Sequence, residues 1–241
     1  MTPAGDPRQP QRKRLLVAIG TRPEAIKMAP VVLALRQEPW ADVRILATAQ
    51  HRQMLDQVLA AFGLVPDIDL DIMQPGQALA ELTARLLLRL DGVLAEEAPD
   101  AILAQGDTTT VMSVALAAFY RRIPLGHVEA GLRTGDLYNP FPEEMNRIVA
   151  GRLARWHFAP TAQSRDNLLA EGFDPASIHV TGNTVIDALL QVADRELALP
   201  VAIPEGSRLV LVTAHRRENF GEPFRQVCLA IRELADAHPD I

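Results

Sequence analysis

The sequence contains few cysteine and aromatic residues. Phe, Trp and Tyr together make up 5% of the chain. Its single cysteine, Cys228, excludes an internal disulfide and fits a reducing compartment. Because Cys228 lies among apolar residues at helical spacing, we expect it to be buried in a core. No stretch approaches the roughly 20 apolar residues that cross a membrane, and no targeting segment is visible. We therefore expect a cytoplasmic protein with no membrane partner.

Other absences narrow the classes of function. The formal net charge of −6 argues against nucleic acid as a partner, although a local basic pocket can still bind a small anion. No GxGxxG or Walker pattern follows the first apolar run, which disfavours a dehydrogenase and leaves no generic phosphate motif. No His/Asp spacing forms a metal-ligand set, so neither a metal nor another cofactor is expected.

Short apolar runs alternate with longer amphipathic patterns along the 241 residues. Runs that lack a polar alternating face are typical of strands covered by helices on both sides. The predicted strands are Leu15–Ile19, Val43–Thr48, Ala101–Ala104, Leu125–Val128, Trp156–Ala159, Ile178–Val180 and Leu209–Thr213. The predicted helices are Gln77–Glu97, Thr108–Arg121, Glu143–Leu153, Thr161–Glu171, Val185–Arg195 and Pro223–Ala237. This alternation predicts an α/β fold with a parallel, doubly wound sheet, whose ligands bind at the carboxyl ends of the strands.

The chain divides into three predicted segments. Residues 1–14 are rich in proline, arginine and glutamine, which predicts a disordered tail. Residues 15–182 predict an N-terminal Rossmann-like domain. Residues 183–241 lead through a linker containing proline and glycine into one strand and one helix, which predicts the start of a second, incomplete Rossmann-like domain.

The first strand end carries the segment GTRPEAIKMAP, residues 20–30. Gly20 can take the positive φ of a tight turn, and Glu24 suits the electropositive start of a helix. Arg22 and Lys27 lie close enough along the sequence to face one anion together. A helix start with two solvated cations is the alternative interpretation.

Two later strand ends carry carboxylates. Asp107, in QGDTTT, either caps the next helix or points into a cleft. Glu129 directly follows a predicted buried strand, where its side chain needs a partner. Glu143 stands at a predicted helix start, where stabilisation by the helix dipole is a sufficient alternative. Arg147 could neutralise these carboxylates or meet a substrate phosphate.

Two histidines also follow strands. His215 lies in TAHRREN, a basic cluster that suits a diphosphate, with a solvated turn as the alternative. His51 lies in AQHRQ, where an exposed polar position is the default interpretation. Carboxylates at several strand ends, together with cations, suggest acid–base chemistry on a substrate with a charged leaving group.

Six collinear motifs carry a resemblance to a known family: GTRPEAIKMAP, TAQHRQMLDQVL, QGDTTT, GHVEAGLRTGDLYNPFPEEMNR, TGNTVIDALL and TAHRREN. From Leu15 to its end the chain resembles the bacterial non-hydrolysing UDP-N-acetylglucosamine 2-epimerases. The resemblance implies two Rossmann-like domains of the GT-B type flanking a cleft, with the second domain truncated. It also implies reversible conversion of UDP-N-acetylglucosamine to UDP-N-acetylmannosamine, by elimination of UDP to a bound glycal and re-addition, for surface polysaccharide precursors.

The resemblance also implies roles for particular residues. The family's acid–base carboxylates match Asp107, Glu129 and Glu143, and its catalytic or phosphate-binding histidine matches His215. Its residues that contact the nucleotide sugar match Arg22, Lys27 and, more weakly, Arg147. Part of a regulatory substrate site found in some members matches Gln50, His51 and Gln53. The stretch IMQPGQ lacks an arginine that some regulated members place there, so regulation is not predicted.

Two further expectations follow from the family. Its members are usually homodimers, which makes a homodimer the expected assembly. Its second domain continues past Ile241 with the turns that grip uridine and phosphate. We therefore expect the 241-residue chain by itself to bind UDP poorly and to be inactive.

Three other functions stay open on the sequence. A hydrolysing epimerase would release UDP and free N-acetylmannosamine, although the PEAIK segment favours the non-hydrolysing branch. A relative could instead act on a modified UDP-sugar. A non-catalytic nucleotide-sugar sensor is the rival from another class, and the presence of all three carboxylates and His215 disfavours it.

Overall fold

The computed structural model describes residues 12–48, 52–72, 76–193, 195, 202–214 and 221–241, with only the backbone described for 52–54. The chain forms two units, residues 1–194 and 195–241, and each is described by itself. The boundary lies beyond the predicted 182 because helix α7 (Thr184–Ala193) packs against helix α1 (Arg22–Gln37) of the first unit.

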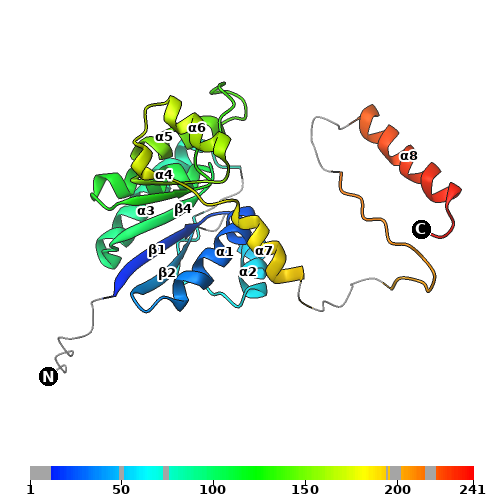
Figure 1. Ribbon diagram of the computed structural model, residues 1–241, viewed down its shortest axis with the longest axis horizontal. Coiled ribbons are helices and arrows are strands. Elements are labelled where there is room, and N and C mark those ends of the chain that lie inside the picture. Colours follow the sequence, from blue (N-terminus) through cyan, green and yellow to red (C-terminus); the bar gives the residue numbers. More distant parts are fainter. Residues whose placement is uncertain (1–11, 49–51, 73–75, 194, 196–201, 215–220) are drawn as a thin grey trace. The chain divides into compact units, whose positions relative to one another are not determined.

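The first unit alternates strands with helices (Figure 1). Its strands are β1 Lys13–Ile19, β2 Ala41–Ala47, β3 Ile68–Asp69, β4 Ala101–Gln105, β5 Leu125–Val128, β6 Trp156–Ala159 and β7 Ile178–Val180. Its helices, besides α1 and α7, are α2 Arg52–Ala61, α3 Leu79–Glu97, α4 Thr109–Tyr120, α5 Glu143–Leu153 and α6 Ala162–Ala170, with a 3-10 turn at Pro175–Ser177.

The strands form one parallel sheet in the order β3-β2-β1-β4-β5-β6-β7. The six strands predicted within this unit and the doubly wound parallel arrangement are confirmed. Helix α2 and the two-residue strand β3 were not among the predicted elements. The chain crosses from β1 outward to β2 and then back to β4, so β1 and β4 are neighbours where the strand order reverses.

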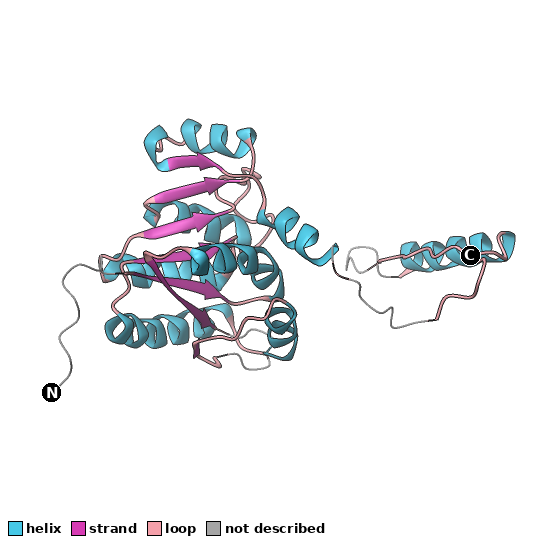
Figure 2. Ribbon diagram, turned by 60° about the horizontal axis from the view of Figure 1, so that its bottom comes forward, coloured by secondary structure: helices cyan, strands magenta, loops and turns pink. Residues whose placement is uncertain are grey.

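Helices cover both faces of the sheet, as Figure 2 shows. Along β1 the side chains alternate between the two layers. Val17 and Ile19 belong to the core that includes α1 and α2, and Leu16 and Ala18 belong to the core that includes α3 and α4. Because both sets are buried, the strand shows no polar face in its sequence.

The first strand begins earlier than predicted. β1 starts at Lys13, so the last two residues of the predicted tail 1–14 belong to the sheet. Lys13 Nζ binds Asp100 Oδ1 at 2.8 Å, and Arg14 Nε binds Asp42 Oδ2 at 3.0 Å. The first pair is exposed and the second is partly buried, and both accompany the start of the strand. Residues 1–11 lie outside the described part of the chain.

Gly20 does not adopt the positive φ that the sequence predicted. A glycine is needed there for a steric reason. A Cβ atom at this position would lie 2.5 Å from Thr110 Oγ1 and 2.9 Å from Thr48 Oγ1. Those two hydroxyls share a buried hydrogen bond of 3.0 Å directly beside the turn. The chain can therefore leave β1 close to α4 only if residue 20 has no side chain.

Two expectations for the second unit are wrong. Residues Leu209–Thr213 form no strand, because a parallel strand needs a neighbour for its backbone groups and no described residue of this unit supplies one. Helix α8 (Glu222–Ala237) is present as predicted, but Cys228 on it is exposed. No strand among the described residues of this unit covers the apolar side of the helix, so Cys228 has no core to enter.

Candidate functional site

A polar cavity of about 460 Å³ lies where β1, β4 and β5 end. This is the edge of a parallel sheet at which ligands bind, next to the point where the strand order reverses. We call it the polar cavity. Its lining residues are Thr21, Pro23, Glu24, Lys27, Gln105, Gly106, Asp107, Thr108, Glu129, Leu132 and Glu143. Four of these side chains are carboxylates, which come from three different segments of the chain.

Glu129 stands at the centre of a set of hydrogen-bond donors. Lys27 Nζ donates to its Oε2 at 2.6 Å, Gln105 Nε2 donates to the same oxygen, and Asn183 Nδ2 donates to Oε1 at 2.9 Å. Only 12% of the Glu129 side chain is exposed. The residue has φ of 64°, an uncommon value for a residue with a Cβ. A strained backbone and three donors together fix this carboxylate at the end of β5.

Asp107 does not cap α4. That role belongs to Thr108, whose hydroxyl accepts from Val111 N at 3.3 Å. The Asp107 carboxylate instead accepts from Arg147 Nη2 at 2.5 Å. Burial raises the pKa of Asp107 above its usual value, while Arg147 acts in the opposite direction and the carboxylates of Glu143 and Glu129 add to the rise. The carboxyl is thus moved toward the range in which it can both accept and donate a proton.

Arg147 connects the cavity to the loop before α5. Its Nη1 lies 3.2 Å from Oε2 of Glu144, which is completely buried. The other oxygen of Glu144 accepts from the backbone N–H groups of Thr134 and Gly135 at 3.0 and 3.2 Å. The buried carboxylate therefore balances the guanidinium charge and anchors the loop at once. Arg147 is held from both sides with its charge directed at Asp107.

Two buried side chains hold the turn that carries Asp107. Asn146 Nδ2 donates to the carbonyl oxygen of Asp107 at 2.9 Å. His127 Nε2 lies 2.7 Å from the carbonyl oxygen of Gly106, to which it donates a hydrogen bond. Burial lowers the pKa of His127 to about 4, against the raising effect of that hydrogen bond, so the ring is neutral near pH 7. The turn between β4 and α4 is consequently fixed through its backbone, which leaves the Asp107 side chain free to face the cavity.

Glu24 is the most deeply buried carboxylate of the cavity wall, with 2% of the residue exposed. The sequence predicted Glu24 at the electropositive start of a helix, and at the start of α1 it forms a capping box with Thr21. Its Oε1 also accepts from the Thr108 hydroxyl at 2.7 Å. Burial raises the pKa of Glu24 from 4.5 to about 7, against the lowering effect of these hydrogen bonds.

Most of the predicted site residues that the structure describes lie close together. Asp107, Glu129, Glu143 and Lys27 line the polar cavity, and Arg147 reaches it through Asp107. Arg22 is exposed at the first position of α1 and is not one of the residues that line the polar cavity, so its shared contact with an anion stays a prediction. Other predicted site residues lie outside the described part of the chain, namely His215, Gln50 and His51. For Gln53 only the backbone is described.

The comparisons with known proteins identify the family. The family model described as UDP-N-acetylglucosamine 2-epimerase matches residues 33–241. The chain belongs to the UDP-N-acetylglucosamine 2-epimerase family. It is 54% identical to the UDP-N-acetylglucosamine 2-epimerase of Escherichia coli K12 over 95% of the chain and 63% of that protein. It is 51% identical to that of Bacillus subtilis, over 96% of the chain and 61% of the relative. The chain thus spans less than two thirds of the length of these curated relatives.

Solved structures agree with this assignment and with a fold of the GT-B type. The UDP-GlcNAc 2-epimerase from Neisseria meningitidis, determined bound to UDP-GlcNAc, has 48% identity and a TM-score of 0.84 over 95% of this chain and 64% of its own. A lipopolysaccharide outer core galactosyltransferase matches with 11% identity and a TM-score of 0.53, over 81% of this chain and 48% of its own. The second likeness concerns the fold alone.

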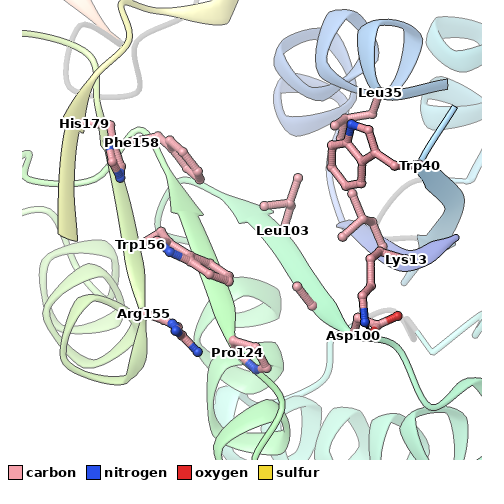
Figure 3. Close-up of a pocket in the computed structure, with 12 residues that line it drawn as sticks. Lys13, Leu35, Trp40, Asp100, Leu103, Pro124, Arg155, Trp156, Phe158 and His179 are labelled. Carbon is pink, nitrogen blue, oxygen red and sulfur yellow. Dashed lines mark hydrogen bonds and ion pairs between the residues drawn. The ribbon is translucent and has the colours of Figure 1, made fainter. Parts of the chain in front are cut away.

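In this epimerase-family chain a second hollow, of about 590 Å³, lies over one face of the sheet, along β6 and the first halves of β1 and β4 (Figure 3). Trp40, Trp156 and Phe158 face it, and most of its lining is apolar. Of its described lining residues one is a carboxylate, Asp100, and that group is paired with Lys13 at 2.8 Å. The hollow is larger but lacks converging acid–base groups, so the polar cavity is the candidate active site.

Two other features are absent from the described residues. No cluster of three or more His, Cys, Asp or Glu side chains that could hold a metal ion occurs among them. Within the same residues no helix has both the length and the apolar character needed to cross a membrane.

Proposed function

We propose that the protein interconverts UDP-N-acetylglucosamine and UDP-N-acetylmannosamine, without net hydrolysis, by eliminating UDP and adding it back. The observation that carries this proposal is the convergence of Asp107, Glu129 and Glu143 on one cavity that also contains Lys27. Relatives about 50% identical are named UDP-N-acetylglucosamine 2-epimerase, which supports the substrate, and one solved relative was determined with UDP-GlcNAc bound.

The chemistry explains why several carboxylates are needed. In the elimination, a carboxylate takes the proton from carbon 2 as the bond from carbon 1 to the diphosphate oxygen breaks, which leaves a carbon 1–carbon 2 double bond and UDP. In the return step the diphosphate oxygen attacks carbon 1 while a carboxyl group delivers a proton to the other face of carbon 2. A base and an acid on opposite faces are required for inversion, so a single carboxylate is not sufficient.

Cations have a separate task in this reaction. The proton on carbon 2 is not adjacent to a carbonyl group, so it becomes acidic only while the diphosphate is leaving. Positive groups that stabilise the diphosphate therefore lower the barrier. Lys27 lines the cavity and can turn from Glu129 to a phosphate oxygen. We assign the remaining diphosphate contacts to Arg22 and His215 on the strength of the family resemblance, with Arg147 holding Asp107 in place.

Product analysis by proton NMR tests the proposal. The full-length protein is incubated with UDP-N-acetylglucosamine, and the anomeric signals are followed to equilibrium. Accumulation of UDP-N-acetylmannosamine with the nucleotide still attached is the expected result. Free N-acetylmannosamine together with UDP would replace the proposal by a hydrolysing epimerase. Binding of the nucleotide sugar without turnover would replace it by a sensor, and turnover of only a modified UDP-sugar would change the substrate.

Three further proposals concern the context of the enzyme. We propose a cytoplasmic homodimer that supplies precursors of surface polysaccharides, since nucleotide sugars are the activated donors for such polymers. Sedimentation of the full-length protein tests the assembly, and a single species of monomer mass at micromolar concentration would refute it. Loss of a surface polysaccharide on deletion of the gene, restored by the active protein but not by an inactive variant, tests the role.

A further inference from the structure

One carboxylate joins two segments that both line the polar cavity and lie far apart in the sequence. Glu24 Oε2 accepts from the backbone N–H of Gly20 at 2.5 Å and of Thr21 at 3.3 Å, which is the ordinary task of a capping-box residue. Its other oxygen, Oε1, accepts from the Thr108 hydroxyl at 2.7 Å. Helix capping does not require this second contact, because Thr108 lies 84 residues away in the sequence.

The two partners lie directly beside candidate catalytic groups. Lys27 follows Glu24 by almost one turn of α1, and its Nζ contacts Glu129. Thr108 immediately follows Asp107 and is the N-cap of α4. The Glu24–Thr108 hydrogen bond thus connects the helix that carries Lys27 to the turn that carries Asp107. Glu24 lines the cavity but only 2% of the residue is exposed, and both of its carboxylate oxygens already accept hydrogen bonds from the protein.

We propose that Glu24 is a positioning residue that acts through the Thr108 hydroxyl to fix the placement of Lys27 relative to Asp107. The inference rests on the proposed epimerase function, because it assigns these two groups to one reaction. A base and a diphosphate-binding cation must reach the same sugar at the same moment, so their relative placement controls the rate. A shift of about 1 Å between reacting groups costs on the order of 100-fold in rate.

The variant Thr108→Val tests the link, because valine keeps the shape of threonine and removes the hydroxyl. Thr108→Ser retains the hydroxyl and should restore the link. The matched control is Thr161→Val on α6, where the threonine side chain also caps a helix by accepting from Ser164 N at 3.1 Å but does not line the polar cavity. Both valine variants lose one N-cap hydrogen bond, so they share the stability cost of that loss.

Kinetics of the full-length protein then separate positioning from stability. We expect Thr108→Val to lower kcat by about 10- to 100-fold with KM changed by less than about threefold, which is the signature of an interaction that matters in the transition state. Thr108→Ser should recover most of kcat, and Thr161→Val should keep kcat within about twofold of the unmodified enzyme. A Thr108→Val enzyme with unchanged kcat would overturn the inference.

A double-mutant cycle with Glu24→Ala identifies the partner. If Thr108 acts through Glu24, adding Thr108→Val to Glu24→Ala should lower kcat no further. Multiplying losses would show instead that Thr108 contacts the substrate itself, which would also overturn the inference. Failure of the unmodified protein to epimerise would refute the proposed function, an outcome distinct from either result in the variants.

Discussion

Replacement of Glu24 by glutamine should change how stability depends on pH. The pKa of Glu24 is about 7 in the folded protein, against an ordinary value of 4.5. Glutamine is nearly isosteric and retains an oxygen that can accept the N–H groups of Gly20 and Thr21. It cannot ionise. The difference in unfolding free energy between wild type and Glu24→Gln therefore isolates the titration of this one carboxyl group.

The sign follows from which state holds the proton more tightly. Between pH 4.5 and 7 the folded protein keeps the Glu24 proton while the unfolded chain releases it. Stability from this group is therefore fully present below pH 4.5 and is lost as the pH rises through 7. With about 1.36 kcal/mol per pKa unit, the wild type should lose roughly 2–3 kcal/mol relative to Glu24→Gln between about pH 5 and pH 8.

Urea unfolding followed by tryptophan fluorescence measures this difference. Both tryptophans, Trp40 and Trp156, lie in the unit formed by residues 1–194, so the signal reports on the unit that contains Glu24. Glu81→Gln, at a largely exposed helix position, controls for exchanging a carboxylate for an amide. A wild type minus Glu24→Gln difference that stays flat from pH 5 to 8, or that grows with pH, would refute the reasoning.

Three other perturbations follow from the same structure, each read by urea unfolding. His127→Gln should remove a pH dependence of stability whose sign is opposite to that of Glu24. The pKa of His127 is about 4 in the folded protein, below the ordinary 6.5. The wild type should therefore lose stability relative to the variant as the pH falls from 6.5 toward 4. Asn183→Leu should cost about 1–3 kcal/mol, because Glu129 Oε1 loses its 2.9 Å amide donor; Asn183→Asp losing less than the leucine variant would argue against that cause. Gly20→Ala should cost about 1–3 kcal/mol through the clash with Thr110, and Thr110→Ala in the same chain should recover part of it; equal stability of the single variant would contradict the steric account.

The sheet could be predicted from the sequence because its strands are buried on both faces. Runs such as Leu125–Val128 contain no polar alternation, and the structure places them between two helix layers. Leu209–Thr213 shows the limit of that signal, since an equally apolar run forms a strand only where a neighbouring strand exists. The exposure of Cys228 has the same cause. An amphipathic pattern predicts that one face of a helix is apolar, but it does not identify the element that packs against that face.

The candidate site could be predicted where a residue directly ends or follows a strand. Asp107 and Glu129 occupy such positions, and both line the polar cavity. Gln105 and Asn183 also lie at strand ends, but they were not predicted as site residues because their amide side chains carry no charge. Only the structure shows that both donate hydrogen bonds to Glu129. Glu24 was expected at the helix start, but no spacing in the sequence reveals its contact with a threonine 84 residues away.

Exchange of the hydrogen on carbon 2 with solvent tests the central claim most directly. UDP-N-acetylglucosamine is incubated in D₂O with the full-length protein, with Asp107→Asn, and with the control Asp136→Asn on an exposed loop. We predict deuterium at carbon 2 with the unmodified protein and the control, and a rate about 10²- to 10⁴-fold lower with Asp107→Asn. Epimerisation without deuterium incorporation, or full exchange by Asp107→Asn, would contradict the account.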